Sequence, residues 1–333
     1  MAFSGKMFQG KTFWLSLAGM TAVAAVLSLF CGRYGLAPLN VVKAVLGLAE
    51  RNMDANIVLS VRLPRIILAL LVGAGLAVSG AAFQGVFQNP LVSPDVLSVS
   101  SGAAFGAVLG IMLDAGQSML VVMALVMGCV SVFLTYAGAK VQRKVSVLSL
   151  VLSGIIMSAL FNALISLMKY IADTETQLPA ITYWLLGSFA ATTYRHVLIA
   201  APPVLLGMAA LLTMGHKINI LSLGDEEAHA LGIDPSWTRI GIIIAATLVT
   251  AACITVTGII GWVGLVIPHI ARLLVGPNHS RLLPASVLLG AMFMTLMDLL
   301  ARTLLATEIP VGVLTALVGA PFFMFLFHRQ AGM

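Results

Sequence analysis

Residues 61–82 read VRLPRIILALLVGAGLAVSGAA, and this stretch decides the fold class. After Arg65 it continues for 17 residues without a charge. About 20 mainly apolar residues in a helix cross the hydrocarbon core of a bilayer. A strand of a membrane barrel would alternate apolar and polar side chains, and this stretch does not. The stretch therefore predicts a membrane-spanning helix.

The composition extends this prediction to the whole chain. Of 333 residues 60% are hydrophobic and only 9% are charged, and the mean hydropathy is +1.06. Soluble domains average about 25% charged residues. So few charges cannot cover the surface of a soluble protein, which excludes a soluble enzyme, a disordered chain and a nucleic-acid-binding module.

Apolar stretches bounded by charge, glycine or proline predict about ten membrane-spanning helices, so we expect an all-α polytopic protein. They lie near residues 13–32, 61–82, 95–113, 118–138, 146–169, 195–214, 239–257, 260–275, 283–301 and 310–327. A short apolar piece at 178–190 predicts a re-entrant or interfacial helix. We expect one transmembrane domain over 1–333, with a short cytoplasmic flank at 1–12.

Basic residues predict the orientation of the chain. An even number of spans places both termini on one side, and the tight group Lys140, Arg143 and Lys144 is typical of a cytoplasmic loop. We therefore expect both termini in the cytoplasm. The positive charges between Arg33 and Arg65 fall on the outer side, against this rule, and require another explanation.

Three arginines on the predicted outer side are candidates for recognition. Arg62 and Arg65 are spaced i, i+3, and Arg302 follows Asp298 by four residues. Arginine binds carboxylates through two parallel hydrogen bonds, which favours docking of an acidic partner. The alternative is that these side chains only reach the lipid headgroups.

The predicted inner loop LGDEEAHALGID, residues 223–234, is a second candidate. Acidic residues favour a helix start at Asp225, and Gly232 favours its end. This predicts a short amphipathic helix that a soluble cytoplasmic partner can hold. Glu226, Glu227 and His229 lack the spacing of metal ligands, so we expect no metal site.

Two blocks rich in glycine and proline predict helices near a transport pathway. Residues 258–272, GIIGWVGLVIPHIAR, carry three glycines and a proline at membrane depth, which indicates a broken or tightly packed helix. Residues 308–321, EIPVGVLTALVGAP, open the last span, with Glu308 suited to the positive start of a helix. Three separated cysteines and no paired catalytic side chains indicate no disulfide, no catalytic residue and no intramembrane enzyme.

These segments together resemble the FecCD family, the permease subunits of type II ABC importers for iron-siderophores, haem and cobalamin. The resemblance runs nearly end to end, and its blocks occur in family order. They are residues 62–65, 73–85, 88–103, Trp184 with Gly187 and Ser188, 224–234, 258–272 and 308–321.

The resemblance implies a homodimer of ten-helix subunits in a bacterial or archaeal inner membrane. Two ATP-binding subunits would dock on the inside and a soluble substrate-binding protein on the outside. ATP and Mg²⁺ would be used by the ATPase subunits, with no cofactor on this chain. Energy would come from those subunits, and alternating access would move a metal chelate along the dimer axis.

The resemblance also implies roles for individual residues. Arg62, Arg65 and Arg302 correspond to outer arginines that pair with glutamates of the binding protein. The coupling helix that sits in an ATPase groove corresponds to Gly224, Asp225, Glu226, Glu227, Ala228, His229, Ala230, Leu231 and Gly232. The inner gate corresponds to Val145, Ser146, Val147 and Leu148.

The resemblance implies a ferric siderophore as the expected substrate, with haem, cobalamin and molybdate or tungstate as the open choices. The alternative function is an ion-coupled secondary transporter. That mechanism needs carboxylates or an ion site within the spans, and Asp95, Asp114, Asp298 and Glu308 are predicted at span ends. We therefore predict an ABC importer permease and not an enzyme.

Overall fold

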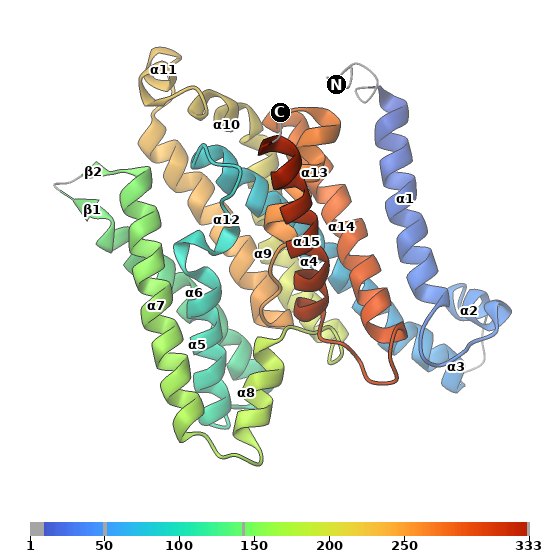
Figure 1. Cartoon of the computed structure of the whole chain (residues 1–333). Helices are drawn as coiled ribbons and strands as arrows, with labels where there is room; N and C mark the ends of the chain where they lie inside the picture. The colour runs from blue at the N-terminus through green and yellow to red at the C-terminus, as the bar shows by residue number, and fades with distance from the viewer. Residues whose placement is uncertain (1–9, 49–51, 142–143, 332–333) are drawn as a thin grey trace.

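The computed structural model describes residues 10–48, 52–141 and 144–331, which fold into a helical bundle (Figure 1). Each predicted span falls on one apolar helix, which confirms the all-α class. The helices are α1 (Lys11–Phe30), α4 (Leu63–Val86), α5 (Val99–Met112), α6 (Gly116–Gly138), α7 (Val147–Ile171), α9 (Tyr194–Thr213), α12 (Pro235–Thr257), α13 (Val263–Val275), α14 (His279–Thr303) and α15 (Val311–Ala331).

Short elements connect these helices. They are α2 (Pro38–Val45), α3 (Met53–Asn56), a π-helical turn (Ile57–Arg62), a 3₁₀ turn (Pro94–Leu97), α8 (Gln177–Leu185), α10 (Gly215–Leu221), α11 (Asp225–Ala230) and an antiparallel pair of strands, β1 (Lys140–Val141) and β2 (Lys144–Val145). Helix α8 is the short helix predicted at 178–190. Most of the expected flank at 1–12, and Arg143, lie outside the described residues.

By length and composition, seven helical segments of the described chain can cross a membrane: α1, Met53–Val86, α6, α7, α9, α12 and α14. Helices α5 and α13 have 14 and 13 residues, and a rise of 1.5 Å per residue makes each about 20 Å long. That is shorter than the ~30 Å hydrocarbon core. Helix α5 begins four residues after the predicted start at 95, and α13 begins three residues after the predicted start at 260.

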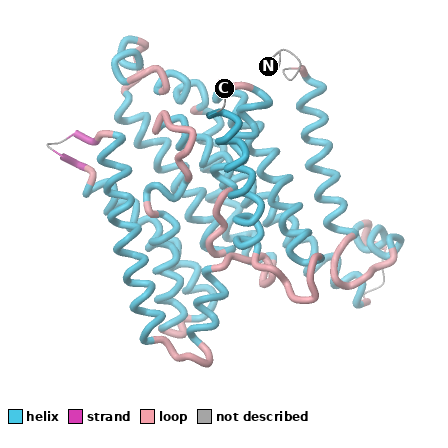
Figure 2. Tube along the Cα trace, in the orientation of Figure 1, coloured by secondary structure: helices cyan, strands magenta, loops and turns pink. Residues whose placement is uncertain are grey.

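The reason lies in the residues before the two helices. Pro94 opens a 3₁₀ turn and Ser98 has a φ of 62°, so α5 begins only at Val99. Gly258 and Trp262 have φ values of 72° and 70°, so the backbone between α12 and α13 is unwound. This confirms the broken helix predicted for 258–272, and Figure 2 shows loop segments within the body of the bundle as well as at its ends.

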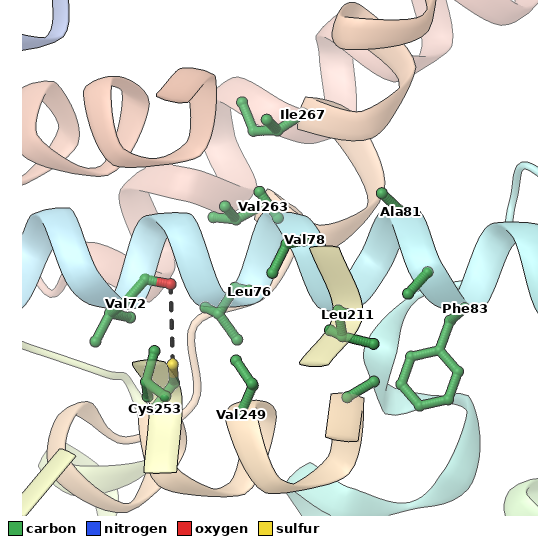
Figure 3. Packing of buried hydrophobic residues seen from close by; sticks show 14 of the residues in the cluster. Val72, Leu76, Val78, Ala81, Phe83, Leu211, Val249, Cys253, Val263 and Ile267 are labelled. Carbon is green, nitrogen blue, oxygen red and sulfur yellow. Dashed lines mark hydrogen bonds between the residues drawn. The ribbon is translucent and has the colours of Figure 1, made fainter. Parts of the chain in front are cut away.

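Helix α4 lies at the centre of the bundle, and most of its side chains are buried. Its apolar face packs on α12 and α13, where Leu76, Val78 and Phe83 meet Val249 and Val263 in one core (Figure 3). The Cys253 thiol on α12 points to the carbonyl of Val72 at 3.9 Å.

Glycines allow the backbone of α4 to approach its neighbours closely. A Cβ at Gly80 would overlap the Gly264 carbonyl of α13. Gly73 and Gly290 of α14 face each other, and a Cβ on either would overlap the carbonyl of the other. Such small-residue contacts drive helix packing in lipid, where there is no hydrophobic effect between helices.

The bundle has two distinct ends (Figure 1). The start of α1, the end of α15, α10, α11 and the β1–β2 hairpin lie toward one end, which we call the hairpin end. Helices α2, α3 and α8 and the segment 304–310 lie at the other, which we call the arginine end. The start of α1 and the end of α15 therefore lie toward the same end of the bundle.

Candidate functional site

Arg62, Arg65 and Arg302 come together at the arginine end in one buried cluster. Their exposed fractions are only 3%, 6% and 6%. The cluster joins α1, α4, α14 and the segment before α15. The docking role predicted for these arginines stays a prediction, and their guanidinium groups face the protein interior.

Arg62 closes the end of α1. It lies in the last position of the π-helical turn, and its Nη1 donates hydrogen bonds to the carbonyls of Leu29 and Phe30 at 2.7 and 3.0 Å. Its Nη2 donates to the carbonyl of Tyr34 at 2.5 Å. The last carbonyls of a helix lack partners within the helix and carry partial negative charge. Arg62 therefore acts as a charged C-terminal cap for α1.

Arg65 binds two carboxylates from the far end of the sequence. Its Nε lies 2.8 and 3.0 Å from the two oxygens of Asp298, and its Nη2 lies 2.7 Å from Asp298 Oδ1. The same Nη2 contacts Glu308, which precedes α15. Asp298 is completely buried, whereas the Glu308 side chain is 18% exposed.

Arg302 completes the cluster on the α1 side. Its Nε lies 3.7 Å from Asp298 Oδ2, one helical turn earlier in α14. Its Nη2 donates to the hydroxyl of Ser28 at 2.5 Å and to the Ser28 carbonyl. Arg65 and Arg302 thus share Asp298, and Arg65 also contacts Glu308, whereas Arg62 binds backbone carbonyls. The three arginines and two carboxylates together leave one positive charge in excess. Asp298 is neutralised by arginines, so it does not provide a free ion site.

The short helix predicted in the loop 223–234 forms, and its role in coupling to an ATPase stays a prediction. Helix α11 covers Asp225–Ala230. The glycines that flank it, Gly224 and Gly232, have positive φ values of 127° and 79°. Ala228 is buried against the protein, whereas Leu231 is 58% exposed. The Asp225 carboxylate accepts a hydrogen bond from Arg239 of α12 at 2.8 Å. The acidic helix therefore projects from the hairpin end and is tied to a spanning helix.

The predicted inner gate lies at the start of α7, also toward the hairpin end. Val145 ends β2, and Ser146 accepts the backbone N–H of Ser149 at 3.1 Å as the N-terminal cap. The Leu148 side chain is 67% exposed on the first turn. A gating role for Val145, Ser146, Val147 and Leu148 stays a prediction.

The environment of Asp95 was not predicted from the sequence. We predicted this carboxylate at a span end, but it lies in the 3₁₀ turn before α5 and accepts a hydrogen bond from Ser100. A cavity of about 10 Å³, enough for roughly one water molecule, borders Asp95, Leu76 of α4 and Trp262. Pro94 was the available signal, because a proline ends the helical backbone on its N-terminal side.

Comparison with known proteins agrees with this architecture. The model of the FecCD transport family matches residues 20–329. The molybdate import system permease protein of Haemophilus influenzae is 41% identical over 94% of this chain and 95% of its own length. A protein of Helicobacter pylori described as a probable iron chelatin transport system permease is 39% identical over 97% of this chain and 99% of its own.

A solved structure shares the fold closely. It shows an inward-facing conformation of a presumed metal-chelate type ABC transporter, with a TM-score of 0.88 and 40% identity over 96% of this chain and all of that one. The family match covers most of the chain, and the relatives match almost from end to end. The chain is a membrane-embedded permease of the FecCD transport family, a type II ABC importer subunit and not an enzyme.

Proposed function

We propose that this permease forms a homodimer whose central pathway carries a ferric siderophore across the inner membrane. The observation that supports this proposal is the acidic helix α11, which is bound to α12 at the hairpin end. Helix α11 is acidic, bounded by glycines and attached to α12 through Asp225 and Arg239. A displacement of α11 by an ATPase subunit would therefore be transmitted to the spanning helix α12. Both termini then face the cytoplasm together with α11 and the basic hairpin.

The choice of substrate rests on the relatives and on the chemistry of the chain. A metal chelate is common to the iron chelatin relative and the solved structure, while the molybdate relative keeps an oxyanion as the second choice. In this proposal the ATPase subunits supply the energy for alternating access of the permease, so transport does not require an ion site in the spans. The cargo is released from a binding protein docked at the arginine end and passes the gate near Leu148.

Transport by the assembled complex tests the function. The permease, its ATPase and its binding protein are placed in liposomes, and uptake of radioactive iron as ferric siderophore is measured. We expect uptake only with hydrolysable ATP. Reversing the charge of Glu226 and Glu227 together should reduce uptake at least tenfold. The control variant Leu39→Ala, near the start of α2, should keep wild-type uptake.

Several results would contradict the proposal. Uptake with an ATPase that cannot hydrolyse ATP would favour an ion-coupled transporter. Uptake of radioactive molybdate in place of ferric siderophore would keep the ABC mechanism but change the substrate. A complex that transports neither, although all subunits assemble, would refute a metal-chelate or oxyanion importer.

We further propose that the arginine cluster docks the binding protein by exchanging carboxylates. The excess positive charge attracts acidic side chains, and Glu308 is the more exposed of the two internal carboxylates. A glutamate of the binding protein that reaches Arg65 would replace Glu308. Because Glu308 directly precedes the segment entering α15, the exchange would signal docking to that helix.

Competition between carboxylates makes a distinctive prediction. Glu308→Gln removes the internal competitor, so the binding protein should bind the reconstituted permease about three- to tenfold more tightly. Arg65→Lys, which loses the forked geometry, should weaken binding. Affinity is measured by surface plasmon resonance in nanodiscs at two salt concentrations. Weaker binding by Glu308→Gln would show that Glu308 only stabilises the fold.

A further inference from the structure

A groove between α6 and α12 lies in the half of the bundle nearer the hairpin end. Its volume is about 340 Å³. Cys129, Phe133 and Tyr136 line it from α6, and Ile240, Ile244 and Thr247 line it from α12. The two sets repeat every three or four residues, so the groove follows the two helix axes for about 12 Å.

The groove opens on the exposed lateral surface of α6 and α12. Phe133 and Ile244 at its edges are 70% and 62% exposed, and both helices are apolar enough to cross a bilayer. Neither an acidic nor a basic side chain lines it. A charged substrate therefore has no charged partner there, whereas a hydrocarbon chain gains close contacts along its length.

Residues that flank the lining in sequence toward the hairpin end are of types found at a membrane–water interface. Trp237, three residues before Ile240 on the same face of α12, is 74% exposed. Lys140, the first residue of β1 and the second after the end of α6, is also exposed. Tryptophan and tyrosine concentrate at the headgroup level, and a lysine beside them attracts a phosphate.

We propose that this groove is a binding site for an anionic phospholipid, with one acyl chain between α6 and α12 and the phosphate near Lys140. The basic character of the hairpin, with Lys140, Arg143 and Lys144 close in sequence, agrees with an anionic headgroup. The acyl chain would contact Ile240, whose neighbour Arg239 binds Asp225 of α11. The lipid therefore supports the helix that carries α11.

The Thr247 hydroxyl distinguishes the proposed acyl chain from another possible occupant of the groove, a ligand with a polar tip. The other buried threonines of α12, Thr250, Thr255 and Thr257, donate to carbonyls four residues earlier. The buried Thr247 hydroxyl has no such partner in the described residues. A ligand with a polar tip at this depth would accept its hydrogen bond, whereas an acyl chain would not need it.

Native mass spectrometry of the purified full-length permease tests the site. The protein is supplied with equal amounts of phosphatidylglycerol and phosphatidylcholine, and the lipids that remain bound are counted. We expect wild-type protein to retain phosphatidylglycerol at least fivefold over phosphatidylcholine. Ile244→Trp, which fills the groove, should remove that retained lipid, and Lys140→Glu should abolish the preference.

Matched controls keep the test decisive. Val122→Trp adds the same side chain to an exposed position of α6 outside the groove and should retain lipid like wild type. A second groove variant, Ile240→Phe, is used if Ile244→Trp loses its monodisperse elution. Equal retention by wild type and both groove variants would overturn the proposal. Loss of the bound molecule in Thr247→Val would also overturn it, in favour of a polar-tipped ligand.

Discussion

Asp298→Ala should nearly eliminate folded permease from the membrane. The substitution leaves Arg65 and Arg302 buried with only Glu308 to balance them, and removing one partner of a buried ion pair costs about 3–5 kcal/mol. That is a large part of the stability of an ordinary domain. Fluorescence-detected size-exclusion chromatography of a tagged chain measures the monodisperse fraction, which should fall several-fold.

The paired variant Arg65→Met with Asp298→Leu separates charge imbalance from lost packing. It removes both charges together and keeps apolar volume, so it should be less damaging than Asp298→Ala alone. Arg33→Ala, at an exposed arginine near the same end, is the control and should elute like wild type. A normal yield of Asp298→Ala would show that water reaches the cluster and compensates the arginines.

Gly80→Ala should destabilise the bundle although it adds one methyl group. The new Cβ would overlap the Gly264 carbonyl, and a backbone atom cannot rotate away as a side chain can. Forcing an extra carbon into a packed core costs about 1–3 kcal/mol, which lowers the melting temperature by about 1–4 °C in a chain of this size. The loss of monodisperse protein on heating in detergent measures this change.

Gly19→Ala is the matched control for that experiment. A Cβ at Gly19 meets no atom within 4 Å, because this side of α1 faces outward. Alanine also favours a helix more than glycine does, so the variant should melt at or slightly above the wild-type temperature. If both glycine variants melt alike, then α4 and α13 can separate without cost and the close packing is not essential.

The sequence predicted the spanning helices well because their information is local. Each span is a continuous apolar run, and Gly224 and Gly232 bound α11 by their own conformational freedom. The exact starts of α5 and α13 were not predicted, because the backbone before each helix depends on distant partners. The carbonyl of Thr257, for example, accepts the backbone N–H of Ser188 at 2.8 Å.

The same distinction explains the arginine cluster. The pair Asp298 and Arg302 was visible as an i, i+4 spacing within one helix. The contact of Arg65 with Glu308 joins residues 243 positions apart, and no local pattern encodes it. Residue type therefore indicated the importance of the arginines, but only the packing of α4 against α14 shows that they are buried.

The attachment of α1 has a consequence for how this chain is made. Its polar contacts with the bundle include Thr21 with Leu288, Ser28 with Arg302, and the Arg62 cap. Ribosomes add about 5–20 residues per second, so Arg302 follows Ser28 by roughly 15 to 55 s. During that interval α1 can form its contacts with Arg62 but not those with Leu288 and Arg302. It therefore remains among lipids or beside the insertion machinery. The apolar surface of α1 is compatible with lipid during this time. The contact between Ser28 and Arg302 forms only when synthesis is nearly complete.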